Sequence, residues 1–259
     1  MARALVTGAA RRLGRAMALS LAERGYDVAV HFAGSEDEAQ EVADLITAMG
    51  RKAVVLEADL LEEAQSQDLL PRAVEGLGGP ITTLVNNASI FEHDTVETAT
   101  RDSWDRHLES NLRAPFVLTQ ALAAQVPDPE IDAQGEPVAQ GLVVNMIDQR
   151  VRKLTPEFMS YTIAKSALWT MTRTMAQGLA PRVRVNGIGP GPTLQGPAQS
   201  AEQFRRQRQA TILQRGSDPE GIIAALDYLL NARAVTGQLL CVDGGQHLGW
   251  QTPDVVDVE

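Results

Sequence analysis

Short apolar runs alternate with longer segments of helical periodicity along most of this chain, and this alternation constrains the fold more than any other feature. The helical segments include residues 36–49 and 62–77. Repeated strand–helix units of this length predict a parallel sheet with helices on both faces. We therefore expect a single doubly wound α/β domain of about seven strands over residues 1–259, with its ligand crevice at the carboxyl ends of the strands. The predicted strands are residues 4–7, 27–32, 53–58, 83–85, 142–144, 183–186 and 239–242.

The first predicted strand runs directly into a glycine-containing turn, and a helix follows. Such a turn at a helix N-terminus offers backbone N–H groups and the helix dipole to a pyrophosphate. Gly8 permits the tight turn, and Gly14 allows the backbone to approach the phosphates closely. We expect Gly8, Leu13 and Gly14 to contact a dinucleotide.

The end of the second strand bears on the choice of cofactor. An NAD site needs a carboxylate there for the ribose 2′-hydroxyl, whereas this chain has His31, Phe32 and then Ser35, with acids first at 36–37. Arg12 stands in the turn where a glycine is usual, and its guanidinium suits a 2′-phosphate. The pattern favours NADPH, although a solvated Arg12 remains an alternative. Ser35 is expected to bind phosphate, to cap the next helix, or both.

Other polar residues also follow predicted strands. Asp59 with Leu60, the segment 87–89 and Asp148 all stand at carboxyl ends, where a parallel sheet binds its ligand. We expect Asp59, Leu60, Asn87, Ala88 and Ser89 to contact the cofactor.

Two segments lack the regular alternation. Residues 125–140 contain three prolines and four acids, and we expect an exposed loop. Residues 190–216 begin with glycines and prolines and continue into an arginine-rich helical stretch, which suits a lid over the crevice. Its arginines are expected to form a solvated face, with ligand contact as the alternative. Pro190, Gly191 and Thr193 are predicted cofactor contacts.

Tyr161 and Lys165 are four residues apart in a helix predicted to start near Pro156, so both side chains lie on one helical face. A fixed ammonium favours the phenolate and is expected to lower the pKa of Tyr161, which would make that phenol a proton donor and acceptor. An isolated pair of this kind is more often an ordinary surface feature. The Tyr161–Lys165 pair indicates a catalytic site only in combination with the other motifs of this chain.

Charge and cysteine content exclude several classes of function. The net charge of −10 argues against a general binder of nucleic acid or membrane surfaces, since both need a basic face. The single cysteine, Cys241, allows no internal disulfide and suggests a reducing compartment. The N-terminus has no signal-peptide layout and no apolar segment is long enough to span a bilayer, so we expect a cytoplasmic protein. No metal site is expected.

Six motifs together resemble the short-chain dehydrogenase/reductase family: TGAARRLG, NNAS, SNLRAPF, YTIAK, RVNGIGPG and VDGG. They occur in the family's order and cover nearly the whole chain. Within the family, the sequence is most similar to the pteridine reductase and dihydromonapterin reductase branch. Arg12 replaces a glycine of the turn, Asp148 stands thirteen residues before Tyr161 where most members carry a serine, and Phe91 follows NNAS. Gly34 departs from this branch, because some of its members have a basic residue there.

The resemblance implies a catalytic set of Asn111, Asp148, Tyr161 and Lys165. Lys165 would also bind the nicotinamide ribose, and Asn111 would hold a water that links Lys165 to solvent. Phe91 and the nicotinamide would sandwich a pterin ring, with core packing as the alternative for Phe91. The family is usually tetrameric, so we expect a homotetramer with interfaces at the C-terminal strand and at helices over 101–125 and 156–180.

Asp148 indicates the class of substrate. An ionised carboxylate only accepts hydrogen bonds, so it would repel a ketone oxygen, whereas a pterin offers N–H donors. The preferred hypothesis is an NADPH-dependent reductase of a dihydropterin such as dihydromonapterin, dihydrobiopterin or dihydrofolate, with Phe91, Asp148 and Tyr161 at the substrate. The alternatives are a carbonyl reductase acting on 3-oxoacyl or similar ketones, and a non-catalytic NADPH-binding regulator.

Overall fold

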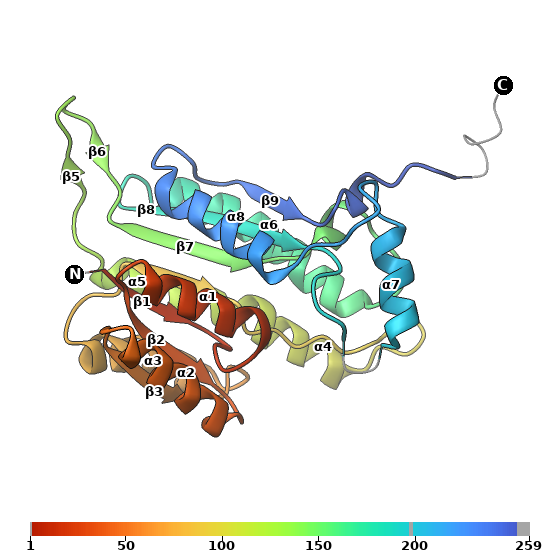
Figure 1. Ribbon diagram of the computed structural model, residues 1–259, viewed down its shortest axis with the longest axis horizontal. Coiled ribbons are helices and arrows are strands. Elements are labelled where there is room, and N and C mark those ends of the chain that lie inside the picture. Colours follow the sequence, from red (N-terminus) through yellow and green to blue (C-terminus); the bar gives the residue numbers. More distant parts are fainter. Residues whose placement is uncertain (1, 197–198, 253–259) are drawn as a thin grey trace.

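The computed structural model describes residues 2–196 and 199–252, and their centre is a seven-stranded parallel sheet (Figure 1). The strand order is β3-β2-β1-β4-β7-β8-β9. The predicted doubly wound α/β fold is therefore confirmed. The strands are β1 (Arg3–Val6), β2 (Asp27–Phe32), β3 (Ala53–Glu57), β4 (Thr83–Asn86), β7 (Gly141–Met146), β8 (Val183–Pro190) and β9 (Leu239–Val242).

Helices cover both faces of this sheet. One face carries α1 (Arg12–Glu23), α2 (Glu36–Ala48) and α8 (Pro219–Asn231). The opposite face carries α3 (Glu63–Leu77), α5 (Ala114–Gln125) and α6 (Met159–Gly178). The helix α4 (Arg101–Leu108) packs against α6, and α7 (Ala201–Gln209) lies toward one end of the molecule.

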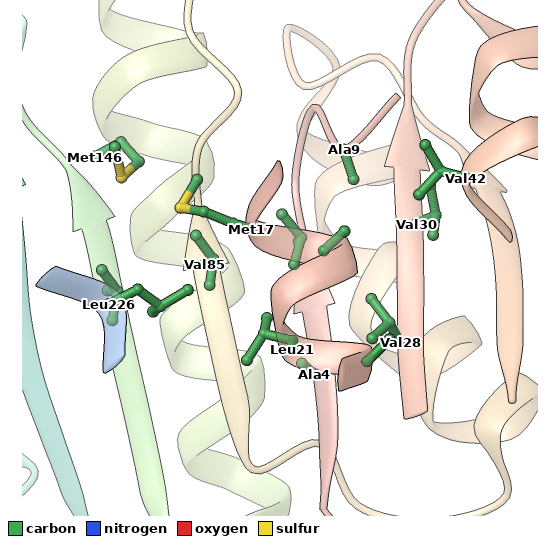
Figure 2. Close-up of a cluster of buried hydrophobic side chains, with 14 of the residues drawn as sticks. Ala4, Ala9, Met17, Leu21, Val28, Val30, Val42, Val85, Met146 and Leu226 are labelled. Atoms are coloured by element: carbon green, nitrogen blue, oxygen red, sulfur yellow. The ribbon is translucent and has the colours of Figure 1, made fainter. Parts of the chain in front are cut away.

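The alternation of side chains along each strand explains why the chain needs two helical layers. In β1, Ala4 and Val6 belong to the core under α1, whereas Leu5 belongs to the core on the other face. Figure 2 shows Met17 and Leu21 of α1 lying over apolar strand residues that include Val28 and Val85. Because both faces are covered, β2, β4 and β7 are buried along their whole length, without an alternation of buried and exposed residues.

Three segments differ from the sequence-based expectations. The helix predicted from Pro156 begins at Met159, because Phe158 adopts a left-handed conformation with φ of 56°. The helix predicted over 101–125 contains a π-helical turn, Glu109–Arg113, between α4 and α5. Within the expected loop 125–140, the strands β5 (Glu130–Ile131) and β6 (Pro137–Val138) form a short hairpin that projects from the molecule (Figure 1).

The sheet topology places the predicted site. The chain lays β2 and β3 on one side of β1 and then returns to place β4 on the other side, so the strand order reverses between β1 and β4. A crevice at such a reversal is where open α/β sheets bind ligands. The predicted lid, residues 190–216, follows β8 at the same edge and includes residues 197–198, which lie outside the described part of the chain. None of the described helices is long and apolar enough to cross a membrane.

Candidate active site

The turn after β1 is built around two glycines. Gly8 has φ of +61°, a left-handed conformation that glycine adopts without strain. A Cβ on Gly14 would clash with the Gly8 carbonyl oxygen and would lie 2.6 Å from Asn87 Nδ2. Gly14 is thus needed so that α1 can pack against the turn, which differs from the predicted reason of close approach to a phosphate.

The end of β4 anchors this turn. Asn87 Nδ2 donates to the carbonyl oxygens of Thr7 and Gly8 at 2.9 and 3.1 Å. Thr7 Oγ1 accepts from the backbone N–H groups of Asn87 and Ala88 at 2.9 and 3.0 Å. The expected role of Asn87 therefore includes joining β1 to β4 across the point where the strand order reverses. Sequence reasoning missed Thr7, although its place between strand and turn was a signal.

The N-terminus of α1 is free to meet an anion. Arg11 occupies the N-cap position without a side-chain capping bond, and the first turn contains no acid. The first N–H groups of a helix lack intrahelical partners, so they favour a phosphate. Together with the glycine turn, this arrangement fits a dinucleotide pyrophosphate. Leu13 packs partly against the core at this point.

His31 supports the turn from β2. Its Nδ1 accepts from the Gly8 N–H at 3.0 Å, and its Nε2 is 3.0 Å from the Ala58 carbonyl oxygen. Because a backbone N–H only donates and a carbonyl only accepts, the ring is neutral with its proton on Nε2. Burial lowers the pKa of His31 to about 4. His31 and Phe32 are both buried, and their predicted contact with the cofactor stays a prediction.

The Arg12 side chain makes its contacts on the side of the turn opposite to the expected 2′-phosphate. Its φ of 54° explains why a glycine is usual at this position. Its guanidinium donates to the carbonyl oxygens of Leu194 and Gln195 at 3.1 and 2.9 Å, in the segment after β8. Since β8 and β2 lie on opposite sides of β1, Arg12 points away from the end of β2, where a 2′-phosphate is expected.

Arg11 is the arginine on the β2 side of the turn. Its Nε donates to Glu38 Oε1 at 2.9 Å, and Glu38 is in the first turn of α2, directly after β2. Arg11 stands next to Arg12 in the sequence, and sequence reasoning considered only Arg12 as a contact for the 2′-phosphate. Ser35 occupies the N-cap position of α2 as expected but makes no side-chain capping bond.

At the end of β3, Asp59 is exposed and Leu60 is buried. Asp59 Oδ1 accepts from the Leu61 N–H at 3.0 Å, which forms a local turn. Asp59 remains accessible to a ligand, and the role of both residues stays a prediction.

Tyr161 and Lys165 lie on one face of α6, and both are buried. Lys165 Nζ donates to the Met146 carbonyl oxygen at the end of β7 at 2.8 Å, and it lies 5.7 Å from the centre of the Tyr161 ring. Burial lowers the pKa of Lys165 to about 8, with the charge of Asp148 acting in the opposite direction.

Asp148 joins Tyr161 directly. The phenol donates to Asp148 Oδ2 at 2.9 Å, while Oδ1 accepts from the Arg150 N–H at 2.8 Å. Burial and the negative charge of Asp148 raise the pKa of Tyr161 well above its ordinary value. This corrects the expectation that Lys165 lowers the pKa of Tyr161, because the exclusion of water and the hydrogen-bonded carboxylate both oppose formation of the phenolate. Burial also raises the pKa of Asp148, against the hydrogen bonds from Arg150 and Tyr161.

Asn111 is fully buried in the π-helical turn. Its Oδ1 accepts from the Ile90 N–H at 2.9 Å, and its Nδ2 donates to the Ile90 carbonyl oxygen at 2.8 Å. The side-chain amide thus holds the segment after β4. The expected link from Asn111 through water to Lys165 stays a prediction.

Phe91 is 53% exposed, so the alternative of core packing does not apply. Its ring stacks on Phe158 with centroids 4.2 Å apart and meets the Tyr161 ring edge-on at 4.7 Å. The structure therefore brings Phe91, Asp148 and Tyr161 together, as predicted. Sequence reasoning missed Phe158, whose only signal was an aromatic residue three positions before Tyr161.

The segment after β8 is tied down by backbone and arginine contacts. A Cβ on Gly191 would lie 2.6 Å from Asp243 Cα, and Thr193 Oγ1 donates to the Gly191 carbonyl oxygen at 3.1 Å. Arg208 Nη1 donates to the carbonyl oxygens of Pro192, at 2.8 Å, and Ser217. Arg208 thus joins the two ends of the predicted lid. Its neighbours at 205 and 206 are exposed, as expected of a solvated face. Pro190 is the last residue of β8.

A dinucleotide-type turn where the strand order reverses, with a Tyr–Lys pair on the helix beside it, defines a Rossmann-type oxidoreductase. A family model described as enoyl-(acyl carrier protein) reductase matches residues 8–247. The chain belongs to the short-chain dehydrogenase/reductase family, as its motifs predicted, and it is an oxidoreductase of that family.

Several relatives resemble the chain over nearly its whole length. YgfF, an uncharacterized oxidoreductase of Escherichia coli (strain K12), is 34% identical over 254 residues, which cover 95% of this chain and 100% of that protein. The 3-oxoacyl-(acyl-carrier-protein) reductase FabG of Staphylococcus epidermidis is 29% identical over 250 residues, covering 95% and 98%. The crystal structure of FolM alternative dihydrofolate reductase 1 from Brucella suis, in complex with NADP, has a TM-score of 0.90 at 44% identity and covers 98% of each chain.

Proposed function

We propose that this protein is an NADPH-dependent reductase that converts a dihydropterin, such as dihydromonapterin, dihydrobiopterin or dihydrofolate, to its tetrahydro form. The observation that carries this proposal is the Asp148 carboxylate, hydrogen-bonded to the Tyr161 phenol at 2.9 Å. An ionised carboxylate in this place complements a ring with N–H donors and opposes the oxygen of a ketone. The 44% identity to the FolM dihydrofolate reductase of Brucella suis supports the same class of substrate.

Asp148, Tyr161 and Phe91 divide the work at the pterin ring. Asp148 accepts hydrogen bonds from ring N–H groups and so fixes the orientation of the ring. The half-exposed ring of Phe91 is an aromatic surface against which a flat ring can pack. Tyr161 keeps its proton at neutral pH, because burial and Asp148 raise its pKa, and it can donate that proton to a ring nitrogen.

The return of the proton also involves Asp148. Burial raises the pKa of this carboxyl group, which makes its protonated form more accessible than for a solvated aspartate. A protonated Asp148 can give its proton back to Tyr161 along their hydrogen bond. Lys165 stabilises the transient phenolate, since its ammonium lies 5.7 Å from the centre of the ring.

The cofactor is NADP(H), and the residues present fit it. When bound, NADPH supplies the hydride. The uncapped N-terminus of α1 and the turn at Gly8 suit its pyrophosphate. Arg11, beside the end of β2, is placed to contact a 2′-phosphate. The NADP complex of the Brucella suis relative supports this choice.

A carbonyl reductase is the second candidate, favoured by the similarity to the 3-oxoacyl-(acyl-carrier-protein) reductase FabG. Steady-state NADPH oxidation with a panel of dihydropterins, 3-oxoacyl thioesters and simple ketones separates the two. Reduction of dihydropterins with little activity on ketones supports the proposal. Efficient reduction of ketones without reduction of pterins would contradict the proposal and support a carbonyl reductase. Binding of NADPH without turnover of any of these compounds would support a non-catalytic regulator.

Assembly and location complete the proposal. We expect a homotetramer in the cytoplasm. The helices of the expected interface expose Trp104 on α4 and Ile163 on α6. Light scattering coupled to gel filtration tests the number of subunits, and a monomeric mass would contradict it.

A further inference from the structure

The helix that carries Tyr161 has an unusual beginning. Phe158 occupies the N-cap of α6, and its side chain has no oxygen that could accept a hydrogen bond from the first turn. The acceptor comes instead from Asp94, in the segment between β4 and α4. Asp94 Oδ1 accepts from the Ser160 N–H at 3.1 Å, and the Asp94 carbonyl oxygen accepts from the Met159 N–H at 3.2 Å. A carboxylate also suits the positive end of the dipole of a 20-residue helix.

Ser160 and His107 extend this contact into a buried chain of hydrogen bonds. Glu92 N–H donates to His107 Nε2 at 3.1 Å, so that nitrogen carries no proton. His107 Nδ1 therefore donates to Ser160 Oγ at 2.7 Å, and the Ser160 hydroxyl donates to Asp94 Oδ2. The side chains of Asp94, His107 and Ser160 are 2% exposed or less.

This direction rules out a hydrolytic role for the same residues. In a nucleophilic triad, the histidine accepts the proton of the serine hydroxyl and the carboxylate contacts the histidine. Here the serine hydroxyl is directed to the carboxylate, and the histidine is itself the donor to the serine. The cluster holds structure in place and does not activate a nucleophile.

The chain of hydrogen bonds connects the two sides of the substrate site. Glu92 and Asp94 closely follow Phe91 in the segment before α4, whereas Ser160 directly precedes Tyr161 in α6. The rings of Phe91 and Tyr161 are 4.7 Å apart and meet edge-on. Their relative position thus depends on bonds between a loop and a helix that are 66 residues apart in sequence.

We propose that Asp94, Ser160 and His107 are positioning residues that hold Phe91 and Tyr161 in the geometry needed for substrate reduction. The proposal rests on the proposed function only in taking Phe91 and Tyr161 as the side chains that face the substrate. We expect the three residues to affect the rate of the chemical step and not the affinity for NADPH.

Ser160→Ala tests the proposal, and Thr162→Ala is its matched control. Both changes remove a buried hydroxyl from the same turn of α6, and alanine favours the helix. The Thr162 hydroxyl has no hydrogen-bond partner among the described residues. Asp94→Asn is a second variant, because its amide can still accept from the Ser160 N–H through oxygen but offers only donors to the Ser160 hydroxyl.

Four quantities measured on each variant decide the outcome: turnover, the Kd for NADPH, the isotope effect and the rate of amide hydrogen exchange. Turnover per NADPH-binding site should fall roughly tenfold to a hundredfold in Ser160→Ala, with an unchanged Kd for NADPH and a larger isotope effect from deuterium at the transferred position. Amide hydrogen exchange should quicken in the peptide that contains Glu92. Thr162→Ala should change none of these four quantities.

A loss of folded protein alone would lower the number of sites and leave turnover per site unchanged, which would overturn the proposal. If the wild type reduces ketones but no pterin, the proposed substrate is wrong, and the turnover of the variants is then compared with that of the wild type on the ketone. The exchange measurement needs no substrate. Unchanged exchange around Glu92 in Ser160→Ala therefore overturns the proposal whatever the enzyme reduces.

Discussion

Tyr161 donates its phenolic hydrogen to Asp148 at 2.9 Å, so the side chain expected to act as the acid is paired with a carboxylate and not with its helical neighbour Lys165. This pairing keeps the phenol protonated and places an acceptor-only group at the substrate. Both properties lead to measurable consequences.

Asp148→Ser tests the class of substrate. The change should lower kcat/KM for dihydropterins by about 2–4 kcal/mol of transition-state stabilisation, the range expected when a buried charged partner is lost. A serine hydroxyl can donate to a carbonyl oxygen, so activity on simple ketones should be unchanged or raised. If Asp148→Ser slows the reduction of ketones and the wild type ignores pterins, the pterin assignment is wrong.

Tyr161→Phe should abolish turnover and leave the Kd for NADPH nearly unchanged, because the hydroxyl transfers a proton and does not hold the cofactor. Lys165→Ala should impair both turnover and binding. Fluorescence titration with NADPH and single-turnover kinetics separate the two effects. Should Tyr161→Phe keep more than about a few per cent of the activity, Asp148 becomes the first alternative proton donor.

Arg11→Ala and Arg12→Gly should affect the cofactor differently. Loss of a charge-assisted contact of roughly 1.5–3 kcal/mol should weaken NADPH binding about tenfold to a hundredfold in Arg11→Ala and leave NADH binding nearly unchanged. Arg12 contacts carbonyl oxygens after β8, so its replacement should alter both cofactors alike. A selective loss of NADPH affinity in Arg12→Gly, with none in Arg11→Ala, would restore the role that the sequence suggested for Arg12.

Gly14→Ala should prevent formation of the cofactor turn, because the added Cβ would clash with the Gly8 carbonyl oxygen. We expect a lower melting temperature and loss of NADPH binding. Gly34→Ala is the matched control, since a Cβ at Gly34 would meet nothing within 4 Å. Equal behaviour of the two variants would contradict the packing role of Gly14.

Acid should destabilise the protein through His31. The folded state lowers the pKa of this ring from 6.5 to about 4, so the unfolded chain binds the proton more strongly. The contribution of His31 to stability is complete above about pH 6.5 and is lost as the pH falls toward about 4. The gap corresponds to about 3 kcal/mol at roughly 1.4 kcal/mol per pH unit.

The free energy of unfolding in urea, measured across this range, checks the contribution of His31. His31→Gln should be less stable at neutral pH and should show a shallower decline on acidification. A decline as steep as that of the wild type would place the acid sensitivity elsewhere, His107 being the next buried imidazole whose pKa burial lowers.

Much of the fold could be predicted because its signals are local. The strands β1, β2 and β7 each contain a short run of apolar residues, and Gly8 marks the turn by a conformation that few other residues adopt. The spacing of Tyr161 and Lys165 places both on one face of any helix. Alternation of strands and helices then leaves few topologies, and the predicted crevice followed from them.

Contacts between distant segments carried no such signal. Asp94 caps α6 from another part of the chain, and no residue near Ser160 in the sequence indicates that Asp94 is its hydrogen-bond partner. Arg12 likewise contacts a distant segment, because its guanidinium donates to carbonyl oxygens that follow β8.

The sequence by itself determined the parallel sheet, the cofactor turn and the family, because periodicity and glycine conformation act over a few neighbouring residues. Only the tertiary structure decided the ionisation of the site. The pKa of Tyr161 depends on which charge lies closer and on how much water is excluded, and both follow from the packing of the segment after β7, which contains Asp148, against α6. A spacing of four residues puts Lys165 beside Tyr161 on the helix. In the folded chain, however, the Lys165 ammonium donates to the Met146 carbonyl oxygen, and the Tyr161 phenol donates to Asp148.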